Sequence, residues 1–391
     1  MDELDANGHE LYAGLRYPWP QAPDSGQVRE VAAGVWWLRM PLPFRLDHIN
    51  LYLLRHDEGW VVVDTGMNTD QTREVWEQVF ERLFGGQPLL AVICTHYHSD
   101  HSGVAGWLAE RFRCPVYMTA AEYRSLYVAV PEASPAGWDF VDFYRKAGFT
   151  EEHAGELYRL IQNGHFRPLH FNSFRRLREG DRLRIGARHW QVVIGRGHSP
   201  EHACLYAEDE GLLIAGDQVL PRITSTVGVH ATEPEADPLR DWLTSLEHLR
   251  QLPDSVLVLP AHERPFFNLH ARLDQLQAHH QAHLALLLAS CDEPRSALEL
   301  MAVLFPTLSG RFDELMALGE TLAHANYLMA EGLLVREHHQ THYRYRRGPR
   351  TQPAVAAPGG GQALGSATTL NIPGSQPVAL QESQCDRQEQ Q

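Results

Sequence analysis

The densest group of potential metal ligands in this 391-residue chain lies in six consecutive positions. The segment THYHSDHSG supplies His96, His98, Asp100 and His101, directly after an apolar run, Leu89 to Cys94, that predicts a buried strand. Alternate residues of an extended loop point the same way, so His96 and His98 can face one cation while Asp100 and His101 face a neighbouring one. Imidazole and carboxylate ligands without a nearby cysteine favour zinc, with iron or manganese as alternatives. The spacing therefore predicts two Zn²⁺ per chain.

Further ligands must come from elsewhere, because four side chains do not complete two coordination shells. Three candidates each follow a predicted strand: His198 in GRGHSPEH, Asp217 in LLIAGD and His262 in VLVLPAHE. A single histidine or aspartate at a strand end is usually a turn residue. The recurrence of one topological position nevertheless strengthens all three, since α/β folds place their sites where strands end.

Two cations about 3.5–4 Å apart would lower the pKa of a shared water and present a bridging hydroxide to an electrophilic carbonyl. The catalytic role predicted for Asp100 is to accept a hydrogen bond from that water and steer its protons. Metal charge would stabilise the oxyanion, so a Ser-His-Asp triad is not required. Gly197 to Ser199 also lacks a nucleophile-elbow pattern.

Alternating strand and helix patterns surround these motifs and predict a mixed α/β (α+β) fold. Helices are expected at Gln71 to Phe84, Gly103 to Phe112 and Pro238 to Leu252, and a helical insertion at about 120–172. The predicted strands are Val35 to Met40, Asn50 to Arg55, Trp60 to Asp64, Leu89 to Cys94, Arg182 to Ile185, Trp190 to Ile194, Ala203 to Ala207, Leu212 to Ala215 and Val256 to Leu259.

The pattern becomes helical after Pro265, with three predicted helices followed by a short strand pair, an order that suggests a winged helix. The helices are Leu269 to Ser290, Arg295 to Phe305 and Phe312 to Ala330, and the strands are Leu334 to Arg336 and His342 to Tyr345. Without an HExxH pattern, a solvated helix face is expected for the histidines of the first helix, which are His270, His279, His280 and His283. We therefore divide the chain into an N-terminal extension (1–27), a hydrolase domain (28–265), a winged-helix-like domain (266–346) and a disordered tail (347–391).

Composition narrows the class of protein further. The net charge of −15, from 34 basic and 49 acidic side chains, repels polyanions and disfavours nucleic acid without excluding a local basic patch. No apolar run reaches the length of a membrane span, and the first residues lack a secretion signal, so a cytoplasmic location is expected. Five scattered cysteines without a CxxC pair predict neither a disulfide framework nor a thiolate zinc site.

From Val35 to Arg346 the sequence resembles the metallo-β-lactamase-fold hydrolases, especially the glyoxalase II-like branch and the group with a C-terminal winged helix. The similar motifs are DTG at Asp64 to Gly66, HYHSDH, GHSPEH, AGD and PAHE, in the family's order. The resemblance implies a four-layer αββα sandwich with the metals at one edge between two sheets. It also implies that His96, His98 and His198 hold one zinc, that Asp100, His101 and His262 hold the other, and that Asp217 bridges them.

The resemblance places two further residues beside the ligands. Asp64 would orient a ligand histidine or cap the DTG turn, and His202 would pack beside the site without ligating. The sequence departs from the usual family pattern at Arg196, where proline is common, and at Glu263, where glycine is common.

The resemblance and the aspartate at position 217 favour hydrolysis of a small-molecule thioester or ester, of the hydroxyacylglutathione or acyl-CoA type. A lactonase is an alternative, weakened by Leu220 where signal-degrading lactonases commonly present tyrosine. A second alternative is a winged-helix-bearing endoribonuclease, in which a basic and aromatic ribbon would bind the phosphates and bases of single-stranded RNA. That ribbon comprises Arg336, Tyr343, Arg344, Tyr345, Arg346, Arg347 and Arg350. We expect instead that this unit packs on the hydrolase domain or on a second subunit of a homo-oligomer. A third class, a metal-binding protein without turnover, would contain zinc and hydrolyse nothing.

Overall fold

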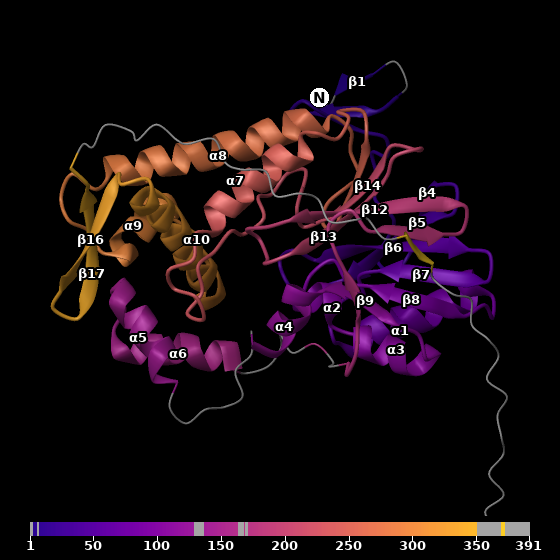
Figure 1. The fold of residues 1–391 in the computed structure, drawn as a ribbon, viewed down its shortest axis with the longest axis horizontal. Coiled ribbons are helices and arrows are strands. Elements are labelled where there is room, and N and C mark those ends of the chain that lie inside the picture. The colour runs from indigo at the N-terminus through magenta and orange to yellow at the C-terminus, as the bar shows by residue number, and fades with distance from the viewer. Residues whose placement is uncertain are drawn as a thin grey trace, which may run out of the picture.

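Two large β-sheets face each other in the part of the molecule drawn on the right of Figure 1. The computed structural model describes residues 3–5, 8–128, 137–162, 168, 171–349 and 369–371. The first sheet has seven strands in the order β10-β9-β8-β7-β6-β5-β4. The pairs β7-β8, β8-β9 and β9-β10 are parallel, and the pairs β4-β5, β5-β6 and β6-β7 are antiparallel. The bounds are β4 (Val28–Ala32), β5 (Val35–Pro41), β6 (His48–His56), β7 (Gly59–Val63), β8 (Leu89–Ile93), β9 (Val116–Thr119) and β10 (Arg175–Leu177).

The second sheet has six strands in the order β15-β14-β13-β12-β11-β18. The parallel pair of β14 and β15 brings the ends of these two strands to the same edge of the sheet. The bounds are β11 (Arg182–Ile185), β12 (Arg188–Gly195), β13 (His202–Ala207), β14 (Leu212–Gly216), β15 (Leu257–Pro260) and β18 (Thr369–Asn371). The strands expected from the sequence in both sheets are present, with ends that differ from the expected ones by a residue or two.

Side chains that alternate along the strands build the layers. Val35 and Trp37 of β5 pack between the sheets together with Trp190 of β12. Leu38 and Met40 point the other way, into a second cluster with the outer helices. These helices are α1 (Asp70–Val79), its π-helical continuation η1 (Phe80–Phe84) and α3 (Ala105–Phe112).

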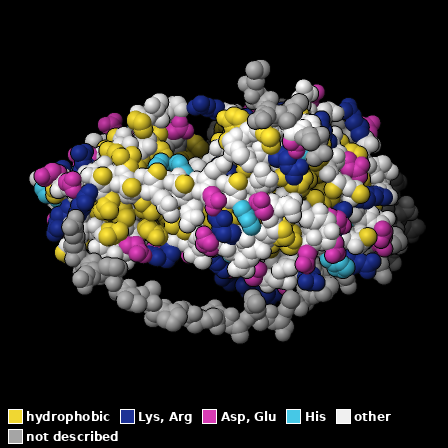
Figure 2. Space-filling view, turned by 90° about the horizontal axis from the view of Figure 1, so that it is seen from above, with side chains coloured by type: hydrophobic (Ala, Val, Ile, Leu, Met, Phe, Trp, Pro, Cys, Tyr) yellow, Lys and Arg dark blue, Asp and Glu magenta, His cyan; other side chains and the backbone are white. Residues whose placement is uncertain are grey.

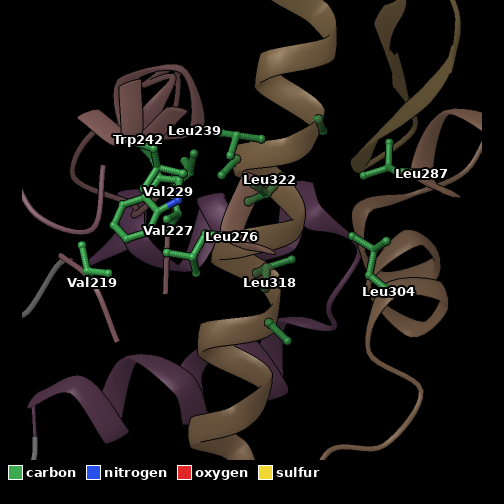
Figure 3. Packing of buried hydrophobic residues seen from close by; sticks show 14 of the residues in the cluster. Val219, Val227, Val229, Leu239, Trp242, Leu276, Leu287, Leu304, Leu318 and Leu322 are labelled. Atoms are coloured by element: carbon green, nitrogen blue, oxygen red, sulfur yellow. The ribbon is translucent and has the colours of Figure 1, made fainter. Parts of the chain in front are cut away.

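Helices also cover the far face of the second sheet, so the predicted four-layer αββα sandwich is confirmed (Figure 1). Val193 and Leu213 of this sheet share a buried cluster with Leu239 and Trp242 of α7 (Pro238–Leu249). Figure 3 shows Trp242 and neighbouring apolar side chains of this cluster packed against the C-terminal helices. The mixed α/β class therefore arises from three buried clusters separated by two sheets.

The C-terminal part has the predicted order of three helices followed by a hairpin. Its elements are α8 (Leu269–Ala289), α9 (Ala297–Leu304), α10 (Arg311–Ala330), β16 (Leu334–His339) and β17 (His342–Arg347). The described part of the predicted insertion also contains three helices, α4 (Ala120–Val128), α5 (Trp138–Ala147) and α6 (Glu151–Gln162). Residues 129–136, 163–167 and 169–170 of the insertion lie outside the described part of the chain.

Helix α8 corrects one expectation. His280 is completely buried, and the side chains of His279 and His283 are only 34% and 17% exposed, so they do not form a solvated helix face. The sequence pattern of α8 alone is misleading because α10 packs against the surface that carries them.

The two ends of the described chain add short strands. Three of them, β1 (Glu3–Leu4), β2 (Glu10–Tyr12) and β3 (Leu15–Tyr17), form a separate sheet within the predicted N-terminal extension. Strand β18 pairs in parallel with β11, so the expectation of a disordered tail does not hold for its three residues. The tail residues 350–368 and 372–391 lie outside the described residues.

The surface gives no sign of a membrane-crossing helix, since none in the described part of the chain combines the necessary length and apolar character. Acidic and basic side chains are interspersed on the face drawn in Figure 2. Cys94, Cys204 and Cys291 are buried free thiols, and Cys114 is partly buried. Cys385 lies outside the described residues.

Candidate metal centre

All seven predicted ligands lie together at one edge of the two central sheets. The loop after β8 carries His96 and His98, and the short helix α2 (Ser99–Ser102) that follows carries Asp100 and His101. The other three side chains come from the second sheet, where His198 follows β12, Asp217 follows β14 and His262 follows β15.

The first group of side chains comprises His96, His98, His198 and Asp217, whose ligand atoms lie within 4.8 Å of one another. His96 Nε2 lies 2.9 Å from His98 Nδ1 and 3.3 Å from His198 Nε2. Asp217 Oδ2 lies 3.3 Å from His198 Nε2 and 4.0 Å from His96 Nε2. Ligands around one tetrahedral zinc at about 2.0–2.1 Å would be separated by about 3.3 Å, so these spacings fit one ion.

The second group comprises Asp100, His101 and His262, and Asp217 touches this group too. His262 Nε2 lies 3.5 Å from Asp100 Oδ2 and 3.4 Å from Asp217 Oδ1. His101 Nε2 lies 3.4 Å from Asp217 Oδ2 and 3.7 Å from Asp100 Oδ2. The carboxylate of Asp217 therefore lies between the two groups, in the position of a bridging ligand.

Hydrogen bonds from the outer ring nitrogens fix which way three of the histidines present their lone pairs. His198 Nδ1 lies 2.8 Å from the carbonyl oxygen of Thr226, and His262 Nδ1 lies 2.9 Å from that of His48. A carbonyl oxygen only accepts, so each Nδ1 carries a proton and each Nε2 is the ring nitrogen that remains to bind a cation. His101 Nδ1 bonds Asp64 Oδ2 at 2.7 Å, with the same consequence for its Nε2.

Two of the inward atoms lack a hydrogen bond within the described part of the chain. Among the described residues, neither His101 Nε2 nor Asp217 Oδ1 has a hydrogen-bond partner, although both are buried. Burial alone would raise the pKa of Asp100, but His101 and His262 outweigh it and hold that pKa at about 2. Burial opposes ionisation of Asp217 as well, and the same two histidines bring its pKa well below the usual value. Burial opposes a positive charge on His101 and His262, but Asp100 and Asp217 outweigh it and raise the pKa of both histidines. These two imidazoles therefore balance the buried carboxylates with positive charge, a role that divalent cations fit.

Asp64 and His202 lie where the sequence places them, in contact with ligands from behind. Asp64 is 2% exposed and accepts hydrogen bonds from the Thr95 backbone N–H at 2.7 Å and from the Thr95 hydroxyl at 2.8 Å. His202 Nε2 accepts the backbone N–H of Asp217 at 3.1 Å. Burial lowers the pKa of His202 to about 3, so it is neutral and its Nε2 is occupied by this bond. His202 therefore positions the backbone of Asp217 instead of reaching the centre.

Glu122 was missed by sequence reasoning, and it positions two ligand segments at once. This completely buried residue of α4 accepts the backbone N–H of Tyr97 at 3.0 Å, between His96 and His98. It also accepts the Ser199 hydroxyl at 2.7 Å and the Glu201 backbone N–H at 2.6 Å, directly after His198. Burial is the dominant cause that raises the pKa of Glu122 to about 7, against these hydrogen bonds. No motif surrounds it, so only the folded structure reveals the contact.

Replacing Glu122 by glutamine is expected to loosen both ligand segments. The amide offers one acceptor oxygen, and its NH₂ group would face a donor that the carboxylate now satisfies. We expect the free energy of unfolding to fall by about 1–3 kcal/mol. Urea denaturation of Glu122→Gln measures this fall, with Glu110→Gln on the exposed side of α3 as the matched control. Equal stability of Glu122→Gln and the control would contradict the positioning role.

Glu263, which stands where glycine is common in the family pattern, adopts a backbone conformation that glycine favours. Its φ angle is 67°, in the left-handed region. Asn50 supports both sides of the turn, because its Nδ2 donates to the carbonyl oxygens of Pro260 at 2.9 Å and Glu263 at 2.7 Å. The turn that carries His262 is therefore held by side chains of the first sheet.

The sandwich and the histidine and aspartate cluster at its edge define a metallo-hydrolase. The family model described as Metallo-beta-lactamase superfamily matches residues 45–262, and the model described as Metallo-beta-lactamase-like, C-terminal domain matches residues 284–348. The chain therefore belongs to the metallo-beta-lactamase superfamily.

Three proteins show how widely this similarity extends. "Probable metallo-hydrolase YqjP" of Bacillus subtilis is 25% identical over 302 residues, which cover 75% of this chain and 92% of that protein. "Acyl-coenzyme A thioesterase MBLAC2" of Homo sapiens is 26% identical over 257 residues, covering 61% of this chain and 81% of that protein. The crystal structure of a beta-lactamase domain protein from Burkholderia ambifaria matches with a TM-score of 0.78 and 41% identity, covering 85% of this chain and 98% of that one.

Proposed function

We propose that this metallo-hydrolase is a binuclear zinc enzyme that hydrolyses acyl thioesters, of the acyl-CoA or hydroxyacylglutathione type. The observation that carries the proposal is the carboxylate of Asp217, with His198 and His101 at 3.3 and 3.4 Å from Oδ2 and His262 at 3.4 Å from Oδ1. One carboxylate between two imidazole groups suits a pair of cations, and zinc suits their imidazole and carboxylate donors.

In this proposal His96, His98 and His198 hold one ion, and Asp100, His101 and His262 hold the other. Bound there, the two ions would supply Lewis acidity, which activates a water and polarises a carbonyl group. The three histidines with fixed outer nitrogens keep their lone pairs turned inward, so the site needs no rearrangement before it binds.

Asp100 is the residue to which we assign proton handling. Its carboxylate is ionised at neutral pH, because His101 and His262 hold its pKa at about 2. An ionised oxygen at the edge of the cluster can accept a hydrogen bond from the attacking water and direct its proton away from the carbonyl carbon. Its side chain is 22% exposed, more than that of His101, His262 or Asp217, so it faces the approach to the site.

Two observations support a thioester as the substrate. The thioesterase MBLAC2 is among the relatives, and its match covers 61% of this chain. The second observation concerns two positions of the sequence. Position 217 carries aspartate, and position 220 carries leucine where signal-degrading lactonases commonly present tyrosine. This leucine is buried, and its carbonyl oxygen accepts a hydrogen bond from Arg272. Assignment to the glyoxalase II-like branch belongs to the same proposal, as does a cytoplasmic location.

The C-terminal helices and hairpin have the order of a winged helix, but the basic residues of the ribbon that the structure describes have partners within the chain, and Arg350 lies outside the described residues. Arg336 bonds Glu235 at 2.8 Å, and Arg347 lies 2.7 Å from Asp292. Arg346 bonds Glu337 at 2.7 Å, and the intervening Tyr345 is 1% exposed. We infer that this unit packs on the hydrolase part and does not bind RNA. These three arginines, which would bind phosphates, form ion pairs within the chain, and the Tyr345 ring that would stack on a base is buried.

A substrate panel with an Asp100→Ala variant tests the proposal. We expect hydrolysis of acyl-CoA and acyl-glutathione thioesters by the zinc-loaded protein, and a fall in kcat of about 10²–10⁴-fold in the variant. Lactones and single-stranded RNA complete the panel, and Asp70→Ala, an aspartate of α1 whose side chain is 98% exposed, is the control. Equal turnover by wild type and Asp100→Ala, or faster cleavage of RNA or lactone than of any thioester, would overturn the proposal.

A further inference from the structure

A second cluster of titratable side chains lies between α8 and α10, separate from the seven residues of the candidate metal centre. Helix α8 contributes His279, His280 and His283, and α10 contributes Glu320 and His324. Residues three or four positions apart share a helix face, so His279, His280 and His283 gather opposite Glu320 and His324. Their surroundings are apolar, since α8 and α10 belong to the buried cluster that includes Leu276, Leu318 and Leu322 (Figure 3).

The cluster has the dimensions of a small cation site with Glu320 at its centre. Glu320 Oε1 lies 3.8 Å from His283 Nδ1 and 4.0 Å from His279 Nε2. His280 Nδ1 lies 3.2 Å from His324 Nε2, which matches the separation of about 3.3 Å between two ligands of one tetrahedral zinc. The ligand atoms of His283, Glu320 and His324 lie within 4.8 Å of one another.

Hydrogen bonds within the described chain do not satisfy this cluster. His280 is completely buried, and its Nε2 has no hydrogen-bond partner among the described residues. His283 Nδ1, which lies 3.8 Å from Glu320 Oε1, is likewise buried without a hydrogen bond among the described residues. No lysine or arginine of the described residues pairs with the carboxylate of Glu320, which is 7% exposed. Unpaired polar atoms in an apolar interior are costly, which indicates that something else satisfies them.

The imidazoles are in the protonation state that binds metal. Burial lowers the pKa of His280 to about 2, and it lowers the pKa of His283 and His324 to about 4. All three are therefore neutral at pH 7. His324 Nδ1 donates to the Glu320 carbonyl oxygen at 2.7 Å, so its Nε2 offers a lone pair toward the cluster.

We propose that α8 and α10 together hold a divalent transition-metal ion of the zinc class, bound by Glu320, His283 and His324 and completed by His280. The ion would join the two helices through ligands as far apart in sequence as His280 and Glu320, which are separated by 40 positions. Its effect would reach the hydrolase part, because the Gly319 carbonyl oxygen accepts the backbone N–H of Val229 at 3.0 Å. The loop of Val229 also carries Thr226, which holds His198.

Metal counting on folded variants of the full chain tests this site. After zinc saturation and desalting, Glu320→Gln and His283→Gln are each expected to contain one ion per chain fewer than wild type. His270→Gln is the matched control, because His270 lies on the same helix but bonds the Leu252 carbonyl oxygen at 2.8 Å, and it should keep the wild-type content. Circular dichroism verifies folding, and wild-type metal content in folded Glu320→Gln and His283→Gln would overturn the proposal.

Hydrogen exchange tests the site without altering it. In an Asp217→Ala chain, whose bridging carboxylate is gone, added Zn²⁺ is expected to slow amide exchange around residues 279–283 and 320–324. Exchange in these segments that is unchanged by saturating Zn²⁺ would contradict the proposal whatever happens at the candidate metal centre. Loss of activity in Asp217→Ala together with this protection would separate the two sites.

Discussion

Replacing Asp217 by alanine is expected to abolish hydrolysis, with a fall in kcat/KM of about 10³-fold or more. Its carboxylate faces His101, His198 and His262 within 3.4 Å, so its loss removes the negative charge shared by both ligand groups. Metal ions in such centres stabilise the charge of the transition state by several kcal/mol, and 1.36 kcal/mol corresponds to a tenfold change in rate. Steady-state kinetics with an acyl-CoA, together with zinc analysis, measures the loss.

A second variant, Asp217→Asn, separates charge from shape. It preserves the size of the side chain, and the backbone N–H of residue 217 can still donate to His202 Nε2. Because the bridging role depends on negative charge, we expect this variant to lose activity nearly as far as Asp217→Ala. Wild-type zinc content and turnover in either folded variant would show that Asp217 does not bridge.

Replacing Asp64 by asparagine is expected to lower zinc affinity or activity by about 10–100-fold, although Asp64 lies behind the ligands. Its carboxylate accepts the Nδ1 proton of His101 at 2.7 Å and the Thr95 hydroxyl at 2.8 Å. An amide NH₂ group facing His101 Nδ1 would favour the tautomer with the proton on Nε2, which turns a donor instead of a lone pair toward Asp217.

Competition with a zinc chelator measures the affinity of Asp64→Asn, and kcat/KM follows at saturating zinc. Asp70→Asn at the start of α1 is the matched control, because the side chain of Asp70 is 98% exposed and far from any ligand contact. Excess zinc should restore part of the activity if Asp64 acts through metal affinity. If Asp64→Asn matched the control in both zinc affinity and kcat/KM, Asp64 would be a turn residue without a role in metal binding.

The candidate ligands were predictable because their signals are local. The HYHSDH segment contains four potential ligands directly after a strand, and His198, Asp217 and His262 each follow another strand of the central sheets. Pairing of neighbouring strands brings those ends to one edge, so the fold class and the convergence of these residues follow from the same pattern. Their roles as metal ligands remain predictions until an ion is observed.

The features that the sequence did not predict depend on contacts between distant segments. Glu122 lies on a helix of the insertion and contacts backbone N–H groups at Tyr97 and Glu201, which no side-chain pattern encodes. His280 and His324 meet only because α8 packs on α10, and periodicity in α8 alone gives no partner. The helix expected up to Phe84 changes to a π-helix at Phe80, where Phe80 packs on Trp76, Phe84 and Phe112.

An anomalous difference map of zinc-soaked crystals, recorded at the zinc absorption edge, tests the central claim most directly. We predict two peaks about 3.5–4 Å apart on either side of the Asp217 carboxylate, one near His96, His98 and His198 and the other near His101 and His262. The absence of any peak there at full zinc saturation, or a single peak that leaves one group of side chains without an ion, would contradict a binuclear centre.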